Sequence, residues 1–280
     1  MKVLVAKHAG VCYGVQRALD LAQDAVEKTS DGNVYSLGPL IHNPQAVEQL
    51  RQSGVLVADT LADATQGTLI IRSHGVAPDV IEQAKDRQLQ VVDATCPHVS
   101  KAQEAARLLA REGYLVIIVG EADHPEVAGI KAYAGENALV ISKAAELPER
   151  IRGRRVGVVV QTTQLVESLN EVVGELLPRT NELRVYNTIC NATAQRQQAA
   201  RELATQVDVV IVVGGHNSGN TTRLAEICHE QNPRTYHVET AEELEPSWFK
   251  DAHCVGVTAG ASTPDEQMRG VIQIIEEMDE

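Results

Sequence analysis

Short runs of branched apolar residues alternate along this chain with longer segments in which apolar residues recur every three or four positions. Continuous Val, Ile and Leu runs are typical of parallel strands covered on both faces, and the longer segments have the helical period. The pattern therefore predicts an α/β fold with parallel sheets. The clearest strands are expected at Lys2–Ala6, Asn33–Leu37, Thr68–Ile71, Leu115–Val119, Val156–Val160, Val209–Val213 and Cys254–Val257.

Three lone cysteines, Cys12, Cys96 and Cys190, each lie where a predicted strand gives way to a predicted helix. Pro97 follows Cys96 and suits the first helical position, and Asn191 follows Cys190 and suits a helix N-cap. The positive end of a helix favours a thiolate over a thiol. A buried cysteine acting as a small apolar side chain is the alternative for any one of them.

Each cysteine is followed, at similar distances along the chain, by two strands that end in polar loops. This repeated order predicts three α/β units, expected at 13–95, 96–189 and 190–280 plus 1–12, with the first strand pairing in the third unit's sheet. Because ligands bind beyond the carboxyl ends of parallel strands, we expect a pseudo-threefold arrangement in which these loops line one cavity. The polar side chains in these loops are His42, His74, His124, Glu126, Thr162, Ser218, Asn220 and Ser262.

The composition excludes several classes of protein. A net charge of −13 argues against a nucleic-acid or anionic-membrane surface. No apolar run approaches the roughly 20 residues that span a bilayer, and the first residues are too weakly apolar for a signal peptide. Five cysteines without a close pair suggest neither a disulfide framework nor a zinc ribbon, so a reducing cytoplasm is expected.

Three cysteines that start helices suit a metal cluster held from three sides. Three ligands on a 4Fe–4S cluster would leave one iron open to act as a Lewis acid on a substrate oxygen. The histidines with Glu126 also allow a zinc or non-haem iron site, although His124 and Glu126 lack the spacing of a helical metal motif. Glu126 is placed either as a general acid or as a solvated loop carboxylate, and the residues alone do not decide. Cys228 and Cys254 are expected to be structural.

Several motifs in order resemble the 4-hydroxy-3-methylbut-2-enyl diphosphate reductase family of the non-mevalonate isoprenoid pathway. The resemblance runs from the segment around Cys12 to residues 260–265. Its most specific pieces are Asp93-Ala94-Thr95-Cys96-Pro97, His124-Pro125-Glu126-Val127, Gln161-Thr162-Thr163 and Asn217-Ser218-Gly219-Asn220-Thr221. Two positions depart from the family: Gly219 replaces a frequent Ser, and Val11 replaces a frequent Phe.

The resemblance implies a trefoil of three α/β units around one 4Fe–4S cluster, with Cys12, Cys96 and Cys190 as ligands and one open iron. It implies that Glu126 supplies protons, that Thr162 positions the substrate hydroxyl and Glu126, and that the other polar loop residues bind the diphosphate. The implied reaction is a two-electron reductive dehydroxylation that gives isopentenyl and dimethylallyl diphosphate. The implied electron donor is a ferredoxin or flavodoxin, for which the basic loop 150–155 is a candidate dock. A cluster-dependent hydratase or isomerase and a non-catalytic iron–sulfur sensor remain as alternatives.

Overall fold

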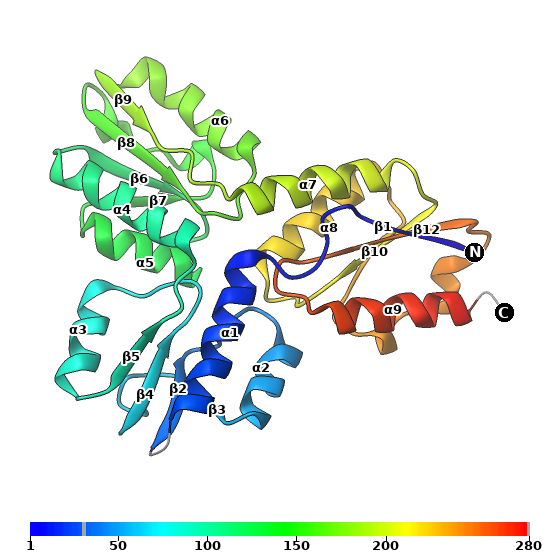
Figure 1. Ribbon diagram of the computed structural model, residues 1–280. Coiled ribbons are helices and arrows are strands. Elements are labelled where there is room, and N and C mark those ends of the chain that lie inside the picture. The colour runs from blue at the N-terminus through cyan, green and yellow to red at the C-terminus, as the bar shows by residue number, and fades with distance from the viewer. Residues whose placement is uncertain (30–31, 279–280) are drawn as a thin grey trace. The chain divides into compact units, whose positions relative to one another are not determined.

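The computed structural model describes residues 1–29 and 32–278, in which the strands form three four-stranded sheets (Figure 1). All strand pairs in these sheets are parallel, so the predicted α/β fold with parallel sheets is confirmed. The strands are β1 (Lys2–Val5), β2 (Asn33–Leu37), β3 (Val55–Ala58), β4 (Gly67–Ile71), β5 (Gln90–Asp93), β6 (Leu115–Val119), β7 (Leu139–Ile141), β8 (Arg155–Val160), β9 (Glu182–Val185), β10 (Val209–Val213), β11 (Thr235–Val238) and β12 (Cys254–Ala259). The α-helices are α1 (Tyr13–Lys28), α2 (Pro44–Gln52), α3 (Pro78–Asp86), α4 (Pro97–Arg111), α5 (Pro125–Ala134), α6 (Val166–Leu176), α7 (Asn191–Ala204), α8 (Gly219–Gln231) and α9 (Asp265–Glu277).

The three sheets share one strand order. It is β3-β2-β4-β5 in the first sheet, β7-β6-β8-β9 in the second and β11-β10-β12-β1 in the third. The two central strands of each sheet are separated along the chain by one edge strand: β2 and β4 by β3, β6 and β8 by β7, and β10 and β12 by β11. Parallel sheets of this kind bind ligands in the crevice beyond the carboxyl ends of two such strands. A binding site is therefore expected at the loops that follow the central strands, namely β2 and β4, β6 and β8, and β10 and β12.

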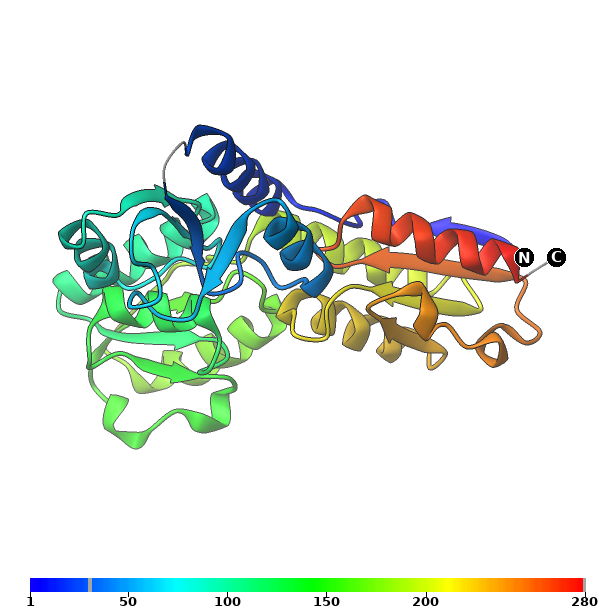
Figure 2. The same cartoon turned by 90° about the horizontal axis from the view of Figure 1, so that it is seen from below.

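The third sheet is completed by the N-terminal strand. β1 pairs with β12 from Lys2 opposite Cys254 to Val5 opposite Val257, as expected from the sequence. Helix α9 runs along this sheet, which is clearest in the second view (Figure 2). Val271 and Ile275 of α9 pack there against the buried side chains of β10 and β12.

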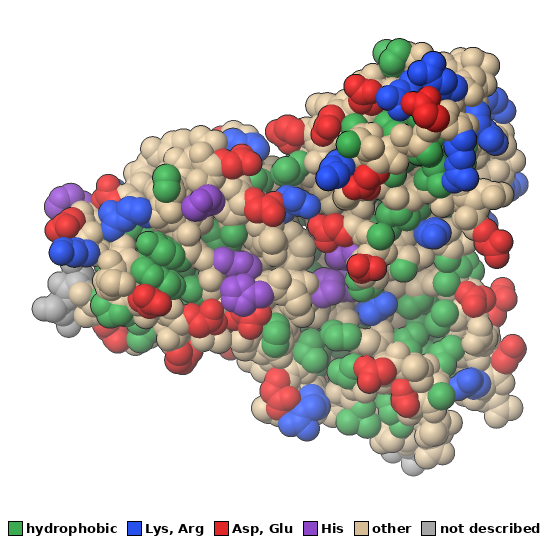
Figure 3. Space-filling model, turned by 180° about the vertical axis from the view of Figure 1, so that it is seen from behind, with side chains coloured by type: hydrophobic (Ala, Val, Ile, Leu, Met, Phe, Trp, Pro, Cys, Tyr) green, Lys and Arg blue, Asp and Glu red, His purple; other side chains and the backbone are tan. Residues whose placement is uncertain are grey.

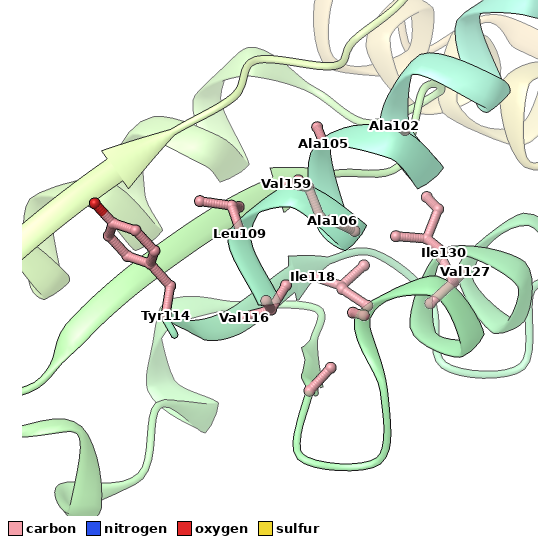
Figure 4. Close-up of a cluster of buried hydrophobic side chains, with 12 residues drawn as sticks. Ala102, Ala105, Ala106, Leu109, Tyr114, Val116, Ile118, Val127, Ile130 and Val159 are labelled. Atoms are coloured by element: carbon pink, nitrogen blue, oxygen red, sulfur yellow. The ribbon is translucent and has the colours of Figure 1, made fainter. Parts of the chain in front are cut away.

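The central strands are apolar throughout because both of their faces are covered. In β6, Val116 and Ile118 pack with α4 and α5 in the cluster drawn in Figure 4, whereas Ile117 and Val119 pack in a second cluster with α6. Gly157 of β8 brings α4 close to this sheet, because a Cβ at Gly157 would lie 2.6–2.9 Å from three side-chain atoms of Leu109. The absence of a side chain at Gly157 thus lets Leu109 of α4 pack directly against the sheet.

The described chain divides into two compact units. The first consists of residues 1–16, 41–49 and 191–278, and the second of residues 17–29, 32–40 and 50–190. The predicted boundaries of three units, at 13–95, 96–189 and 190–280 plus 1–12, stay a prediction. No described helix is long and apolar enough to cross a membrane.

Candidate active site

Every polar side chain predicted for the site lies in a loop, or at a helix start, beyond a central strand of one of the sheets. His42 follows β2, His74 follows β4, and Thr162 follows β8. The remaining ones follow β6, β10 and β12; they are His124, Glu126, Ser218, Asn220 and Ser262. His42, Ser218, Asn220 and Ser262 belong to the first compact unit, and His74, His124, Glu126 and Thr162 to the second.

Each of the three predicted cluster ligands donates a backbone hydrogen bond of the same kind. The N–H groups of Cys12, Cys96 and Cys190 donate to the carbonyls of Ala261 (3.0 Å), Ser73 (2.9 Å) and Thr162 (3.0 Å). Each acceptor lies two residues beyond the strand that pairs with the cysteine's own strand: β12, β4 and β8. After each of the edge strands β1, β5 and β9, a half-buried cysteine therefore lies at the carboxyl edge of a sheet. Each of these cysteines directly precedes the first residue of a helix.

Two arginines hold the loops that lead to these cysteines. Arg196 of α7 is only 6% exposed and donates to the carbonyl of Gly10 from Nε (3.2 Å) and Nη2 (2.7 Å). Arg17 of α1 donates to the carbonyls of Asp93 (3.3 Å) and Thr95 (3.2 Å). Because these carbonyls lie one to three residues before a cysteine, the two guanidinium groups restrict the backbone that carries Cys12 and Cys96.

The other two cysteines have different surroundings. Cys228 is fully buried on α8 with its Sγ beside the carbonyl of Ala200, and burial raises the pKa of its thiol to about 12. Cys254 begins β12 at the opposite end of the strand from Ser262. Neither lies at a helix start, so neither fits the pattern of the first three.

Glu126 is a buried carboxyl group held by one neighbour. It is 2% exposed in the first turn of α5, and Thr162 donates to it twice, from N–H to Oε1 (2.7 Å) and from Oγ1 to Oε2 (2.8 Å). Burial raises the pKa of Glu126 to about 7, although both hydrogen bonds from Thr162 oppose that rise. A carboxyl group with this pKa can give up or take a proton near neutral pH.

His124 is held as a neutral imidazole next to this carboxyl group. Its Nδ1 accepts the N–H of Glu126 (3.1 Å) as the N-cap of α5, which leaves the ring proton on Nε2. Burial, together with the charge of Arg72, lowers the pKa of His124 to about 4. The ring of His74 lies edge-on to that of His124 at a centroid distance of 5.6 Å. The second unit therefore brings His74, His124, Glu126 and Thr162 into one neighbourhood.

The first unit forms a polar cradle at the start of α8. Ser218 caps the helix by accepting the N–H of Thr221 (3.3 Å), and Ser262 donates to the carbonyl of His42 (2.9 Å). Asn220 is 5% exposed, yet neither its Nδ2 nor its Oδ1 has a hydrogen-bond partner among the described residues. A buried amide without partners costs free energy unless a ligand binds it. Helix N-termini favour anions, so this cradle suits phosphate oxygens.

The described residues contain no group of three His, Cys, Asp or Glu side chains arranged to hold one metal ion. Cys12 lies in the first compact unit, and Cys96 and Cys190 lie in the second. The three thiols nevertheless fit an iron–sulfur cluster in kind. Cysteine sulfur is the ligand that such clusters require, and the repeated hydrogen bond supports all three in the same way.

Two polar residues near these sites were not predicted. Thr221 has a buried Oγ1 without a partner among the described residues, and Arg72 has a buried Nε in the same condition. The sequence places Arg72 directly after the apolar strand β4, but it does not show that the Nε of Arg72 lacks a partner among the described residues. Histidine side chains are visible on the face shown in Figure 3, where acidic and basic side chains are otherwise interspersed.

The chain matches a family model described as LytB protein over residues 3–276. It is 52% identical to the 4-hydroxy-3-methylbut-2-enyl diphosphate reductase of Geobacter sulfurreducens over 279 residues, covering 100% of this chain and 98% of the relative. It is also 52% identical to the reductase of the same name from Trichlorobacter lovleyi over 278 residues, covering 98% of this chain and 99% of the relative.

Two solved structures that are similar to this chain are also diphosphate reductases by their descriptions. A structure of (E)-4-hydroxy-3-methyl-but-2-enyl diphosphate reductase, described as the terminal enzyme of the non-mevalonate pathway, is similar with a TM-score of 0.74 and 47% identity. That match covers 99% of this chain and 100% of the other. The E-1-hydroxy-2-methyl-but-2-enyl-4-diphosphate reductase from Plasmodium falciparum gives a TM-score of 0.90 at 26% identity, covering 98% of this chain and 87% of the other.

Proposed function

Because this chain belongs to the LytB protein family, we propose that it is a 4-hydroxy-3-methylbut-2-enyl diphosphate reductase. The reaction takes two electrons and two protons, breaks the allylic C–O bond, and gives water with isopentenyl or dimethylallyl diphosphate. The observation that carries the proposal is the Glu126–Thr162 pair, because it is a proton source with a pKa near neutrality in a buried site.

The diphosphate is bound by neutral donors. Asn220 and Ser218 at the start of α8 contact its oxygens in the first unit, with Ser262 and His42 beside them. The Nε2–H of His124, together with His74, contacts it from the second unit. The low pKa of His124 keeps this imidazole neutral, so it binds as a hydrogen-bond donor at any physiological pH.

Proton delivery uses the hydroxyl of Thr162. The protonated Glu126 donates to Thr162 Oγ1, whose own hydrogen can then turn toward the hydroxyl of the substrate. The hydroxyl group thus leaves as water rather than as hydroxide. The Thr162 N–H donates to the other carboxyl oxygen and fixes its orientation throughout.

Cys12, Cys96 and Cys190 would hold one 4Fe–4S cluster, which would supply single-electron transfer and Lewis acidity. Arg196 keeps the loop before Cys12 in place, and Arg17 keeps the loop before Cys96 in place. Thiol ligands need a reducing compartment, which fits a cytoplasmic enzyme.

The electron donor is a ferredoxin or flavodoxin. In the basic loop 150–155, the candidate dock for this donor, two of the arginines already form ion pairs. Arg152 pairs with Glu149 (3.0 Å) and Arg155 with Glu182 (2.6 Å). Exposed pairs of this kind leave little free positive charge to attract an acidic partner.

An anaerobic assay of the purified, iron-loaded protein tests the proposal. The allylic diphosphate substrate is added with and without a chemical reductant, and the products are separated by chromatography. We expect both C5 diphosphates only when the reductant is present. Product formation without electrons would identify a hydratase or isomerase instead, and cluster binding without turnover would identify a sensor.

A further inference from the structure

A cavity lies in the second compact unit, and none of the residues proposed for the reaction lines it. Its volume is about 530 Å³. It is bounded by the ends of β2, β3 and β4, by the first turns of α3, and by α5. Figure 1 shows α5 on the side of the second sheet that faces the loops leaving β4. Cavities of this size are typical of sites for small molecules.

Arg72 gives the cavity its chemistry. Its Nε is buried and has no hydrogen-bond partner among the described residues. Burial lowers the pKa of its guanidinium, and no acidic group contributes to that pKa. Gly38 lies against it, because a Cβ there would be 2.6 Å from Arg72 Nη1. Arg72 is half-buried, and its unpartnered Nε would gain a charge-assisted hydrogen bond when an oxyanion binds.

The rest of the lining favours one class of ligand. Arg87 adds a second cation and donates to the carbonyl of Leu61 (2.6 Å), while Asp59 is the one acidic side chain in the lining. Two cations and one anion leave a net positive charge. The other walls are mainly apolar, with Leu37, Val76 and Val80 among them. The lining therefore suits an anion that carries a short apolar chain.

We propose that the Arg72 cavity is a second binding site of this protein, which takes a small organic phosphate with a short alkyl chain. The guanidinium of Arg72 binds the phosphate oxygens in a fork, and the apolar walls receive the chain. The site also reaches the reaction chemistry, because the charge of Arg72 adds to the effect of burial, which is the larger cause of the low pKa of His124. An anion bound to Arg72 would weaken that effect.

Calorimetric titration of the iron-loaded protein with n-butyl phosphate tests this proposal, with inorganic phosphate as the probe without a chain. We expect two sites per chain, one of which prefers n-butyl phosphate over inorganic phosphate. Arg72→Met should weaken that site by about 10–100-fold, the usual contribution of a hydrogen bond to a charged group. Arg72→Lys should retain part of the affinity. Asn220→Leu, which alters the reaction site, should leave it unchanged.

Ala128 provides a test that does not depend on a buried residue. It is exposed on α5 and lines the cavity. Ala128→Glu places a carboxylate in the cavity and should abolish n-butyl phosphate binding there, whereas the neutral match Ala128→Gln should preserve it. Binding that is lost with Asn220→Leu but unaffected by Arg72→Met and Ala128→Glu would overturn the proposal. That outcome would leave the proposed reductase function intact.

Discussion

The pKa of Glu126 makes a quantitative prediction about the pH dependence of turnover. With a pKa of about 7, half of the Glu126 carboxyl groups carry a proton at pH 7. At the ordinary value of 4.5, about one in 300 would do so. Burial therefore raises the population of the proton donor by about 160-fold at pH 7. Because the acid must be protonated, kcat should fall about tenfold per pH unit above 7.

The assay measures kcat at saturating substrate, so that ionisation of the free diphosphate does not enter. Glu126→Gln keeps the shape of the side chain and can accept the Thr162 N–H, but it has no acidic proton. We expect it to lose about 10²–10⁴-fold in kcat and to show no fall above pH 7. Thr162→Ala removes a hydrogen bond that lowers the pKa of Glu126, so the falling limb should move to higher pH while kcat decreases.

Two results would refute this reasoning. One is a wild-type kcat that stays constant between pH 6 and pH 9, because the donor would then have a pKa outside this range. The other is a Glu126→Gln variant that turns over within about twofold of wild type, which would mean that the proton comes from elsewhere.

Further variants test other parts of the structure. Cys228→Ser should leave the iron content per chain at the wild-type level, because that thiol is buried beside Ala200 and away from any helix start. Asn220→Leu should raise KM by about 10–100-fold with an unchanged circular dichroism spectrum. Arg196→Met should lower the melting temperature and speed iron release to a chelator, since it frees the Gly10 carbonyl. Gly157→Ala should lower the free energy of unfolding by about 1–3 kcal/mol in urea titrations. In a Leu109→Ala background, Gly157→Ala should cost less than it does in the wild type, because the side chain with which the new Cβ would clash is gone.

Much of the fold follows from the pattern of apolar runs. Strands such as β2, β6 and β10 begin and end at the residues that the sequence predicts, because a strand covered on both faces needs an unbroken apolar segment. The edge strand β11, by contrast, has the sequence Thr-Tyr-His-Val and only its last residue fully buried. An edge strand with little burial leaves no clear apolar run, so the pattern gave no sign of it.

The candidate site likewise has features that the sequence predicts and features that it does not. Its polar residues could be predicted because each follows an apolar central strand, which is a local property of the sequence. The pairing of Glu126 with Thr162 was expected only from the family resemblance, because it joins loops from two strands and depends on the register of the second sheet. Arg72 was missed for another reason. Its importance lies in the absence of a partner for its Nε among the described residues, and only coordinates can show that.

The strand that completes the third sheet affects the order in which the protein can assemble during its synthesis. β1 leaves the ribosome long before its partner β12, which lies roughly 250 residues further along the chain. At about 5–20 residues per second, β1 must wait for the roughly 250 residues between them, which takes from about ten seconds to nearly a minute. The hydrogen bond from Cys12 to Ala261 forms only after that wait. The N–H groups of Cys96 and Cys190 can donate their hydrogen bonds earlier, because the acceptor carbonyls of Ser73 and Thr162 precede them in the chain. Newly made chains therefore form the hydrogen bond of Cys12 after those of Cys96 and Cys190. The cluster that we propose for these three thiols is expected to be inserted only after β12 has been made.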